Sequence, residues 1–429
     1  MLYDFQKEII AINPDYSGLW LPCGLGKSLI AIRIINQKPI KKCLIICPKT
    51  LKTNWLNELE MWNINLDQEF EIISKEEFKK EVKEKSIGVN EGIIVDEAHN
   101  QAGYTSQLFK NTIKYFKAIK PKAIYLLTGT PYLSTPFNVM CYERMLGLNT
   151  NWKQYNEEFF NYVRMGKRMI PVFDQSKMPI LVERLKAIGI TRSKEECIDL
   201  PDKIFTSEYF SFTKSQERKQ KQIEDELINI AHIVLWTKIH QLCGCGVLNE
   251  RREPEFVDSD KVNRVMEYAE QYDKFIIVCR YNHELGLLKQ KLEAKGYTVG
   301  LLNGKTKERQ ALIDRAEASD KFIFLINNAV SEGYNLISFN LMLFFSHSFS
   351  YKDYAQIQDR VHRIGQKNKC TYIELVLKGS IDEDILANLK NKEDFNIQLY
   401  KKVWKKKTYK QFSTGKSRHS YINSQAVGQ

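Results

Sequence analysis

Continuous apolar runs alternate with helical patterns over the first 150 residues. Three of the runs end in polar or turn residues: KCLIICP, GIIVDEA and KAIYLLTGTP. Unbroken apolar runs of this length are typical of strands buried on both faces of a parallel sheet. A second set begins at residue 274, with KFIIVCRY, YTVGLLNG, KFIFLINN, NLMLFFSHS and CTYIELVL, and helical spacing lies between them. The pattern predicts an α/β fold with two parallel sheets, over residues 1–147 and 258–400.

The stretch between these two sets has a different texture. Residues 148–257 are rich in aromatic and charged residues and carry long helical patterns, with few strand-like runs. We therefore expect a mostly helical insertion or bridge between the sheets. The polar run NERREPEFVDSD near its end is the best candidate for a hinge.

Composition limits the class of protein. Hydrophobic residues make up 43% of the chain and charged residues 27%, and no apolar run is long enough to span a bilayer. The N-terminus lacks the apolar core of an export signal. The nine cysteines are scattered through apolar segments, which favours reduced, buried thiols. Cys243 and Cys245 are the closest pair, a weak zinc signal without a second pair. We expect a soluble cytoplasmic protein of a bacterial or phage-infected cell, with no membrane contact.

The net charge of +12 is concentrated at one end of the chain. Residues 401–429 hold eight of the 64 Lys and Arg residues and no Asp or Glu, so the rest of the chain carries only +4. Aromatic residues alternate with lysines in this tail. It is either a solvated, disordered end or an extension that contacts nucleic-acid phosphates and stacks on bases.

The sequence LPCGLGKSL at residues 21–29 points to phosphate binding. Gly24 and Gly26 allow the backbone to curl so that its N–H groups face a phosphate chain. Lys27 would neutralise the outer phosphates, and the Ser28 hydroxyl would hold Mg²⁺. The strict form of the motif has glycine where this chain has Leu21. Taken alone, the segment could also be an ordinary strand-to-helix turn.

A second polar group decides between these interpretations. The strand-like run GIIVDEAHN ends in Asp96 and Glu97, and LLTGTP follows on the next such run. Asp96 could hold the Mg²⁺ shell, while Glu97 could orient or deprotonate an attacking water. Parallel strands deliver their carboxyl ends to one edge of a sheet, where α/β folds bind ligands. The sequence therefore predicts ATP hydrolysis, with ATP and Mg²⁺ as its ligands.

Five further segments carry a family resemblance. They are LYDFQKE at 2–8, CPKTLKTNWLNELEMW at 47–62, ITRSKEECIDLPDK at 190–203, SEGYNL at 331–336 and QIQDRVHRIGQ at 356–366. In order and spacing they resemble the motifs of helicase superfamily two, and within it the Swi/Snf-type DNA translocases. The last motifs, with LKGSIDEDI, are most similar to annealing helicases and fork remodellers.

The resemblance implies two RecA-like lobes in tandem and a set of site residues. Gln6 would read the adenine edge, and Arg360 and Arg363 would act as arginine fingers on the transferring phosphoryl group. The implied catalytic residues are Lys27, Asp96, Glu97, Arg360 and Arg363. The implied nucleotide-binding residues are Phe5, Gln6, Cys23, Gly24, Leu25, Gly26, Lys27, Ser28, Leu29, Gly333 and Asn335. The implied metal ligands are Ser28 and Asp96.

DNA contacts are expected to be made mainly to phosphates, without sequence specificity. By motif position the candidates are Lys49, Thr50, Ser331 and Asn335. Thr128 and Thr130 would join the DNA side and report the state of bound ATP, although simple turn chemistry before Pro131 is the alternative. Expected partners are double-stranded or branched DNA, bound by a monomeric motor whose protein partners are unknown.

The predicted function is an ATP-driven translocase on double-stranded DNA that regresses forks, migrates branches or anneals strands in repair, recombination or replication. The adenine motif begins at residue 2, so we expect no chromatin-reading domain before the motor. One alternative is a conventional strand-separating helicase or the motor subunit of a restriction or defence complex. Another is a nucleotide-gated DNA-binding scaffold that hardly hydrolyses ATP, which the catalytic residues present argue against.

Overall fold

The chain divides into two compact units. The computed structural model describes residues 2–84, 86–131, 136–165, 168–226, 232–328 and 334–391. Unit 1 comprises Met1–Asp202, Ser331–Ser338 and Ala355–Cys370. Unit 2 comprises Lys203–Val330, Phe339–Tyr354 and Thr371–Gln429. The tail 401–429 lies outside the described residues, so the two interpretations of it both stay open.

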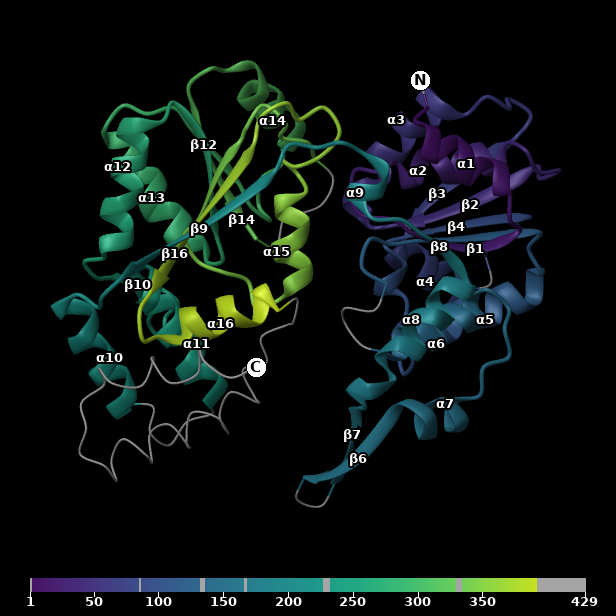
Figure 1. Ribbon diagram of the computed structural model, residues 1–429, viewed down its shortest axis with the longest axis horizontal. Helices are drawn as coiled ribbons and strands as arrows, with labels where there is room; N and C mark the ends of the chain where they lie inside the picture. The colour runs from purple at the N-terminus through teal and green to yellow at the C-terminus, as the bar shows by residue number, and fades with distance from the viewer. Residues whose placement is uncertain are drawn as a thin grey trace. The chain divides into compact units, whose positions relative to one another are not determined.

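Unit 1 is built on a six-stranded sheet with the strand order β3-β2-β4-β5-β1-β8 (Figure 1). All five neighbouring pairs in it are parallel. The strands are β1 (Tyr16–Trp20), β2 (Lys42–Cys47), β3 (Glu69–Ser74), β4 (Gly92–Asp96), β5 (Ala123–Leu127) and β8 (Gly189–Thr191). Every residue of β4 and β5 is buried, as the unbroken apolar runs predict.

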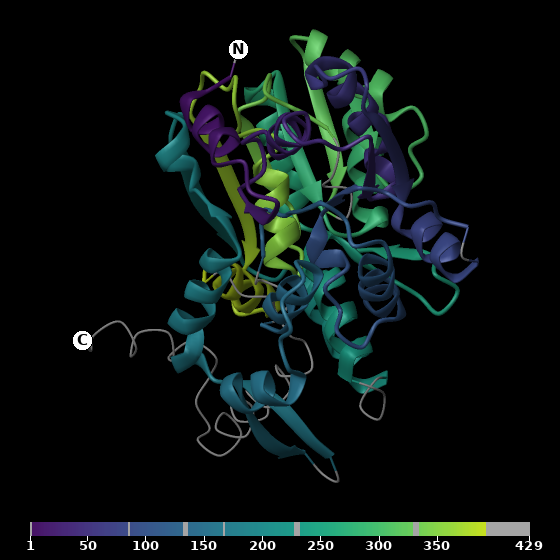
Figure 2. The same ribbon diagram turned by 90° about the vertical axis from the view of Figure 1, so that its right-hand side faces the viewer.

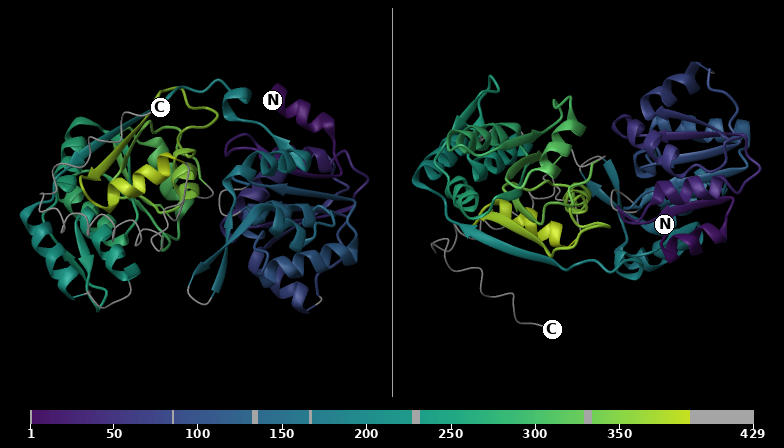
Figure 3. Two further views of the ribbon diagram at one scale, coloured as in Figure 1. Left: turned by 60° about the horizontal axis from the view of Figure 1, so that its bottom comes forward. Right: turned by 90° about the horizontal axis from the view of Figure 1, so that it is seen from above.

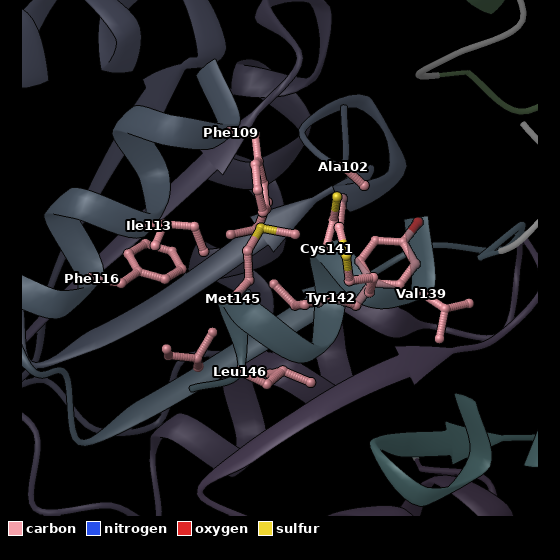
Figure 4. Packing of buried hydrophobic residues seen from close by; sticks show 14 of the residues in the cluster. Ala102, Phe109, Ile113, Phe116, Val139, Cys141, Tyr142, Met145 and Leu146 are labelled. Atoms are coloured by element: carbon pink, nitrogen blue, oxygen red, sulfur yellow. The ribbon is translucent and has the colours of Figure 1, made fainter. Parts of the chain in front are cut away.

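Helices cover both faces of this sheet (Figure 1). Alternate residues of each strand pack on opposite sides, so Ile94 faces α1, α2 and α3 while Ile93 and Val95 face α5 and α6. Figure 4 shows the core on the side of α5 and α6, where Phe109, Ile113 and Phe116 of α5 surround Met145 of α6. The helices of unit 1 are α1 (Asp4–Ile12), α2 (Lys27–Ile35), α3 (Lys52–Trp62), α4 (Lys75–Glu84), α5 (Gln107–Ile119), α6 (Phe137–Met145), α7 (Trp152–Phe159), α8 (Met178–Ala187) and α9 (Lys194–Cys197), with short 3-10 turns η1 (Lys49–Leu51), η2 (Ala98–Asn100) and η3 (Gln175–Lys177).

Trp20 of β1 helps to hold β8, the strand at the edge of this sheet. The Trp20 indole N–H donates to the Leu185 carbonyl at 3.0 Å. A Cβ on Gly18 or Gly189 would lie within 2.3 Å of the Trp20 ring. Only glycine leaves room for the indole at these two positions, so the three-residue strand β8 can pair with β1.

Unit 2 contains a second six-stranded sheet with the order β13-β14-β12-β15-β16-β9. Its four pairs from β13 through β16 are parallel. The strands are β9 (Lys203–Phe210), β12 (Lys274–Cys279), β13 (Val299–Leu302), β14 (Phe322–Asn327), β15 (Leu341–Phe344) and β16 (Cys370–Leu377). The prediction of an α/β fold with two parallel sheets is confirmed.

The helices of unit 2 bury the apolar faces of this sheet. Val262 and Val265 of α12 and Leu288 of α13 pack on Phe275 and Ile277 of β12. The helices are α10 (Lys214–Glu226), α11 (His232–Gly244), α12 (Asp260–Gln271), α13 (Asn282–Ala294), α14 (Arg309–Ala318) and α16 (Ile381–Lys390). A further helix, α15 (Tyr351–Gln358), has its first half in unit 2 and its second half in unit 1.

The stretch 148–257 is divided between the two units. It holds α7, α8, α9, α10 and α11, in line with its helical pattern, but it also supplies β8 to the first sheet and β9 to the second. Two small antiparallel ribbons complete it, β6 (Phe160–Met165) with β7 (Arg168–Phe173), and β10 (Gly246–Leu248) with β11 (Pro254–Phe256). Strands this short, or exposed on one side, give little periodic signal. The predicted boundaries at 147 and 257 stay predictions.

Candidate nucleotide and nucleic-acid site

The sheet order of unit 1 brings three polar strand ends together. β4, β5 and β1 are neighbours and run in the same direction. Their carboxyl ends lead into Asp96–Glu97, Thr128–Thr130 and the loop at 21–26. Since parallel strands present these ends at one edge, the predicted phosphate loop, acidic pair and threonines belong to one site.

The loop before α2 has the backbone of a phosphate cradle. Gly24 and Gly26 have φ values of +89° and +76°, which side-chain-bearing residues rarely adopt. Gly26 is the N-cap of α2, which begins at Lys27. The Lys27 ammonium donates to the carbonyl oxygens of Leu21 and Pro22, at 2.8 and 3.3 Å. A bound phosphate would offer Lys27 full negative charges in place of the partial charges on these two carbonyl oxygens. It would also lie at the N-terminus of α2, which favours anions.

Gln6 is fixed against this loop. It is buried, its Nε2 donates to the Leu25 carbonyl at 3.2 Å, and its Oε1 accepts from the Tyr3 N–H at 3.0 Å. A Cβ on Gly26 would lie 2.7 Å from the Gln6 amide nitrogen. Phe5, on the same helix, lines a cavity of about 540 Å³. The remaining loop residues predicted to bind nucleotide are half-buried or buried beside them: Cys23, Leu25, Ser28 and Leu29.

The acidic pair is buried and strained. Glu97 has φ 48° and ψ 51°, a left-handed conformation that is uncommon for a residue with a side chain. Asp96 accepts from the Trp55 indole N–H at 2.9 Å and from the Glu97 N–H at 2.8 Å. Burial, reinforced by the neighbouring Glu97 charge, raises the pKa of Asp96 to about 6, against the opposing effects of Trp55 and Lys27. A cation beside Asp96 would favour its ionised form.

Oxygen ligands suit Mg²⁺, and this edge supplies them. The Ser28 hydroxyl is on the first turn of α2, and the Asp96 carboxylate ends β4. The buried carboxylate with its raised pKa is a group that a divalent cation would stabilise. These residues therefore fit the Mg²⁺ that the sequence motifs imply.

His99 connects the acidic pair to the third strand end, and its role was not predicted from the sequence. Its Nδ1 lies 3.2 Å from Glu97 Oε2 and 2.9 Å from Thr128 Oγ1. The Thr128 hydroxyl also accepts from the Thr130 N–H at 3.1 Å. Thr128 is fully buried, which does not support the predicted direct contact with DNA. The only sequence signal for His99 was its position two residues after Glu97.

The two predicted arginine fingers lie in different surroundings within unit 1. Arg360 is only 9% exposed; its Nη1 donates to the Tyr334 carbonyl at 3.4 Å and its guanidinium stacks over the Tyr334 ring at 5.7 Å. Arg363 lies against the phosphate loop: its Cβ is 3.1 Å from where a Cβ on Gly24 would be. Burial and the Arg360 charge lower the pKa of Arg363.

Residues 359–363, which include these arginines, are held in place by Lys194, which lies in the motif ITRSKEECIDLPDK at 190–203. The Lys194 ammonium donates to Asp359 Oδ1 at 2.7 Å and to the His362 carbonyl at 2.9 Å. His362 Nε2 in turn lies 2.7 Å from the Pro201 carbonyl. His362 is thus one of the ties between the arginine segment and the rest of unit 1.

The predicted DNA contacts are only partly described. Lys49 and Thr50 are exposed on η1, directly after the carboxyl end of β2, and Asn335 is exposed as well. Ser331 and Gly333 lie outside the described residues. Thr130 is half-buried.

The remaining sequence expectations concern membranes, metals and thiols. Within the described residues, no helix is long and apolar enough to cross a membrane, and no group of three or more His, Cys, Asp or Glu side chains could hold a metal ion. All nine cysteines are free, and burial raises the pKa of both Cys243 and Cys245. These two thiols are ordinary core residues.

Known proteins resemble this chain at low identity. The family described as "Helicase conserved C-terminal domain" matches residues 260–365, which include both arginines. The CHD3-type chromatin-remodeling factor CHR7 of Arabidopsis thaliana is 24% identical over 91% of this chain and 36% of its own length. A Caenorhabditis elegans SWI/SNF-related regulator of chromatin, subfamily A containing DEAD/H box 1 homolog, is 24% identical over 93% of this chain and 50% of its own length.

Among solved structures, the Sulfolobus solfataricus SWI2/SNF2 ATPase core in complex with dsDNA is 22% identical, with a TM-score of 0.42 and coverage of 94% of this chain and 92% of that one. The chain spans half the length or less of the two curated relatives named above. The family match agrees with the predicted enzyme class, an ATP-dependent helicase-type ATPase.

Proposed function

We propose that this chain, whose sequence, lobes and motifs resemble Swi/Snf-type ATPase cores, is an ATP-hydrolysing motor that moves along double-stranded DNA. The observation that carries the proposal is the meeting of the phosphate loop, the buried Asp96–Glu97 pair and Arg363 in one unit. Each of these features has an independent structural explanation, but together they match the parts needed for phosphoryl transfer.

In this proposal the loop binds the phosphates of ATP. Gln6 recognises the adenine edge, and the N–H groups around Gly24 and Gly26 face the phosphates. Lys27 moves away from the Leu21 and Pro22 carbonyl oxygens and neutralises the outer phosphates of ATP. Ser28 and Asp96 would hold Mg²⁺, which supplies charge neutralisation on the phosphate oxygens. Glu97 orients and deprotonates the attacking water, and its carboxylate lies 3.2 Å from His99 Nδ1.

We assign the finger role chiefly to Arg363. Its position against Gly24 places it beside the loop that would hold the phosphates. Arg360 is engaged with Tyr334, so it acts as a positioning residue that holds the segment and raises the positive potential around Arg363. An arginine finger is worth about 10³–10⁵ in rate in well-studied NTPases.

The path Glu97–His99–Thr128–Thr130 offers a physical link from the hydrolytic site to the neighbouring strand end. When the Glu97 carboxylate moves away from His99, the hydrogen bond between His99 and Thr128 changes. Lys49 and Thr50 are exposed after the carboxyl end of β2, two strands away from β5 in the sheet. They are the candidate contacts of unit 1 with DNA phosphates. Such contacts bind DNA without regard to sequence.

The finer proposal is that the motor remodels forks or branches, or anneals strands, rather than unwinding plain duplex. Its support is the resemblance of RVHRIGQ and LKGSIDEDI to annealing helicases. ATPase stimulation by single-stranded, duplex, forked and four-way DNA tests it, together with triplex displacement and strand displacement. We expect triplex displacement and the strongest stimulation by branched DNA. Robust unwinding of a plain duplex would favour the conventional helicase instead.

A further inference from the structure

A buried hydrogen bond reaches Asp96, the candidate metal ligand, from outside the phosphate loop. The Trp55 indole N–H donates to Asp96 Oδ2 at 2.9 Å. Trp55 lies on α3, which follows β2, and β2 is the neighbour of β4 in the sheet. Figure 1 shows α3 beside α2 on one side of this sheet, and Figures 2 and 3 show the same molecule from other directions. A core side chain of α3 is therefore bonded directly to the last residue of β4.

Packing fixes the position of the indole. Trp55 is only 2% exposed, and it belongs to the apolar core that also contains Leu29 of α2 and Cys47 of β2. Its N–H is the single polar group of the side chain, and a buried indole N–H usually finds an acceptor. Asp96, itself 8% exposed, supplies that acceptor. Because the ring is held by the core, the hydrogen bond limits the directions in which the Asp96 carboxylate can turn.

The two oxygens of Asp96 have different donors. Oδ2 accepts from the Trp55 indole, and Oδ1 accepts from the Glu97 N–H at 2.8 Å. Two hydrogen bonds to different oxygens define the orientation of the carboxylate. An ionised carboxylate has about four lone-pair sites, so these bonds leave room for a cation or for the water molecules around it.

The chemistry of the donor suits a metal ligand. An indole N–H donates a hydrogen bond, carries no charge and does not accept. It can therefore orient the carboxylate without neutralising it, whereas a lysine or arginine in its place would compete with Mg²⁺ for the same negative charge. Groups that hydrogen-bond to a metal ligand orient it, and their loss typically costs about 10–100-fold in metal affinity or activity.

We infer that Trp55 is a positioning residue of the magnesium site, which holds the Asp96 carboxylate in the orientation that binds the Mg²⁺ of the nucleotide. This inference rests on the proposed function, because that function makes Asp96 a metal ligand. A purely structural contact would satisfy the buried indole N–H, and its loss would weaken the fold without changing metal affinity.

The test is the affinity of the full chain for Mn²⁺ at saturating ADP, measured from the electron paramagnetic resonance signal of free Mn²⁺. The variant Trp55→Phe keeps an aromatic ring and removes the N–H donor. The matched control is Trp62→Phe at the end of the same helix, because Trp62 packs against the same core and its indole is hydrogen-bonded to the Glu58 carboxylate. We expect Mn²⁺ affinity to fall by about tenfold in Trp55→Phe and to stay unchanged in the control.

A double-mutant cycle with Asp96→Asn shows whether Trp55 acts through Asp96. If it does, adding Trp55→Phe to Asp96→Asn causes no further loss of Mn²⁺ affinity. A further loss as large as in the single variant would show that Trp55 acts by another route, and the inference would be wrong.

Thermal unfolding of each variant is followed beside the titrations, because phenylalanine leaves a cavity where the indole was. Should Trp55→Phe not fold, the indole ¹H–¹⁵N signals of wild type and Asp96→Asn replace it. One indole signal should differ between these two proteins, and the same signal should shift when Mg²⁺ and ADP are added to wild type. If no indole signal responds to both changes, the inference is overturned.

The outcomes separate this inference from the proposed function. If wild type binds ADP and Mn²⁺ and hydrolyses ATP, but Trp55→Phe binds Mn²⁺ equally well, the inference about Trp55 alone is wrong. Equal losses in Trp55→Phe and Trp62→Phe would also overturn it, since they show a general weakening of α3. A wild-type protein that binds neither ADP nor Mn²⁺ contradicts the proposed function itself.

Discussion

The two arginines of the RVHRIGQ segment, three residues apart, have different tasks in this account. On a helix their spacing would put both side chains on one face, but α15 ends at Gln358 and both arginines follow it in turns and bends. The structure separates them: Arg360 is paired with Tyr334, whereas Arg363 lies against Gly24. Which arginine meets the phosphate loop depends on tertiary packing that the spacing does not contain.

Arg363→Ala should therefore abolish DNA-stimulated ATPase, by a factor of about 10³ or more, while sparing DNA binding. Arg360→Ala should lower the ATPase less and also lower the thermal unfolding midpoint, because it removes one hydrogen bond to the Tyr334 carbonyl and the contact with the Tyr334 ring. Steady-state ATPase and duplex anisotropy on both variants check this. Lost DNA binding with retained ATPase in the Arg363 variant would reverse the assignment.

Glu284 offers a separate residue-scale prediction, in unit 2. It is fully buried on α13; the Ser346 hydroxyl and the Tyr281 N–H donate to its Oε2. Burial raises its pKa to about 7 from an ordinary value of 4.5. From about pH 4.5 to 7 the unfolded chain therefore holds fewer protons at this position than the folded one, so stability falls as the pH rises through that window.

The Glu284→Gln variant lacks this titration. Relative to wild type it should gain up to about 3 kcal/mol of unfolding free energy between pH 5 and 8, because each pKa unit is worth about 1.4 kcal/mol. Urea denaturation at both pH values measures the change, with the exposed Glu293→Gln on the same helix as control. A stability difference that does not change with pH would show that Glu284 is ionised throughout.

At the scale of elements, the segment 359–363 depends on Lys194, which begins the four-residue helix α9. This buried ammonium is shared between Asp359 and the His362 carbonyl. Breaking a buried ion pair on one side leaves the other charge uncompensated, which is costly. Lys194 therefore sets where the finger segment lies.

Lys194→Met should lower the kcat of ATP hydrolysis by about tenfold or more through misplacement of Arg363, with little change in the KM for ATP. The control is Lys186→Met, because the Lys186 ammonium makes an exposed ion pair with Glu183. A raised KM with unchanged kcat would instead place Lys194 in nucleotide binding.

Elements with strong local signals were predictable from sequence, and those that depend on distant packing were not. Fully buried strands such as β4 and β5 appear in the sequence as unbroken apolar runs, and Gly24 and Gly26 predict a turn. The edge strand β3 is half exposed and was not predicted. The strand β8 needs Trp20 and two glycines far apart in sequence, so no local pattern marks it. For the same reason the contacts of His99 with Glu97 and Thr128 emerged only from the structure.

At the scale of the whole molecule, the residues proposed for ATP chemistry lie in unit 1, whereas the residues 260–365 matched by the helicase family lie largely in unit 2. The chain crosses between the units repeatedly, since 331–338 and 355–370 belong to unit 1 while the segments around them belong to unit 2. In the proposed motor, a movement of one unit would act on the arginine segment through the chain itself, and bound DNA would alter the rate of hydrolysis in this way.

The central claim is that DNA binding and ATP hydrolysis are coupled through this site. The most direct test is steady-state ATPase of wild type and Glu97→Gln, each with and without duplex DNA, beside ATP binding by both proteins. The account predicts strong stimulation by duplex in wild type, loss of nearly all hydrolysis in the variant, and retained ATP binding in both. A wild-type rate that duplex DNA leaves unchanged, or a variant that hydrolyses ATP as fast as wild type, would contradict it.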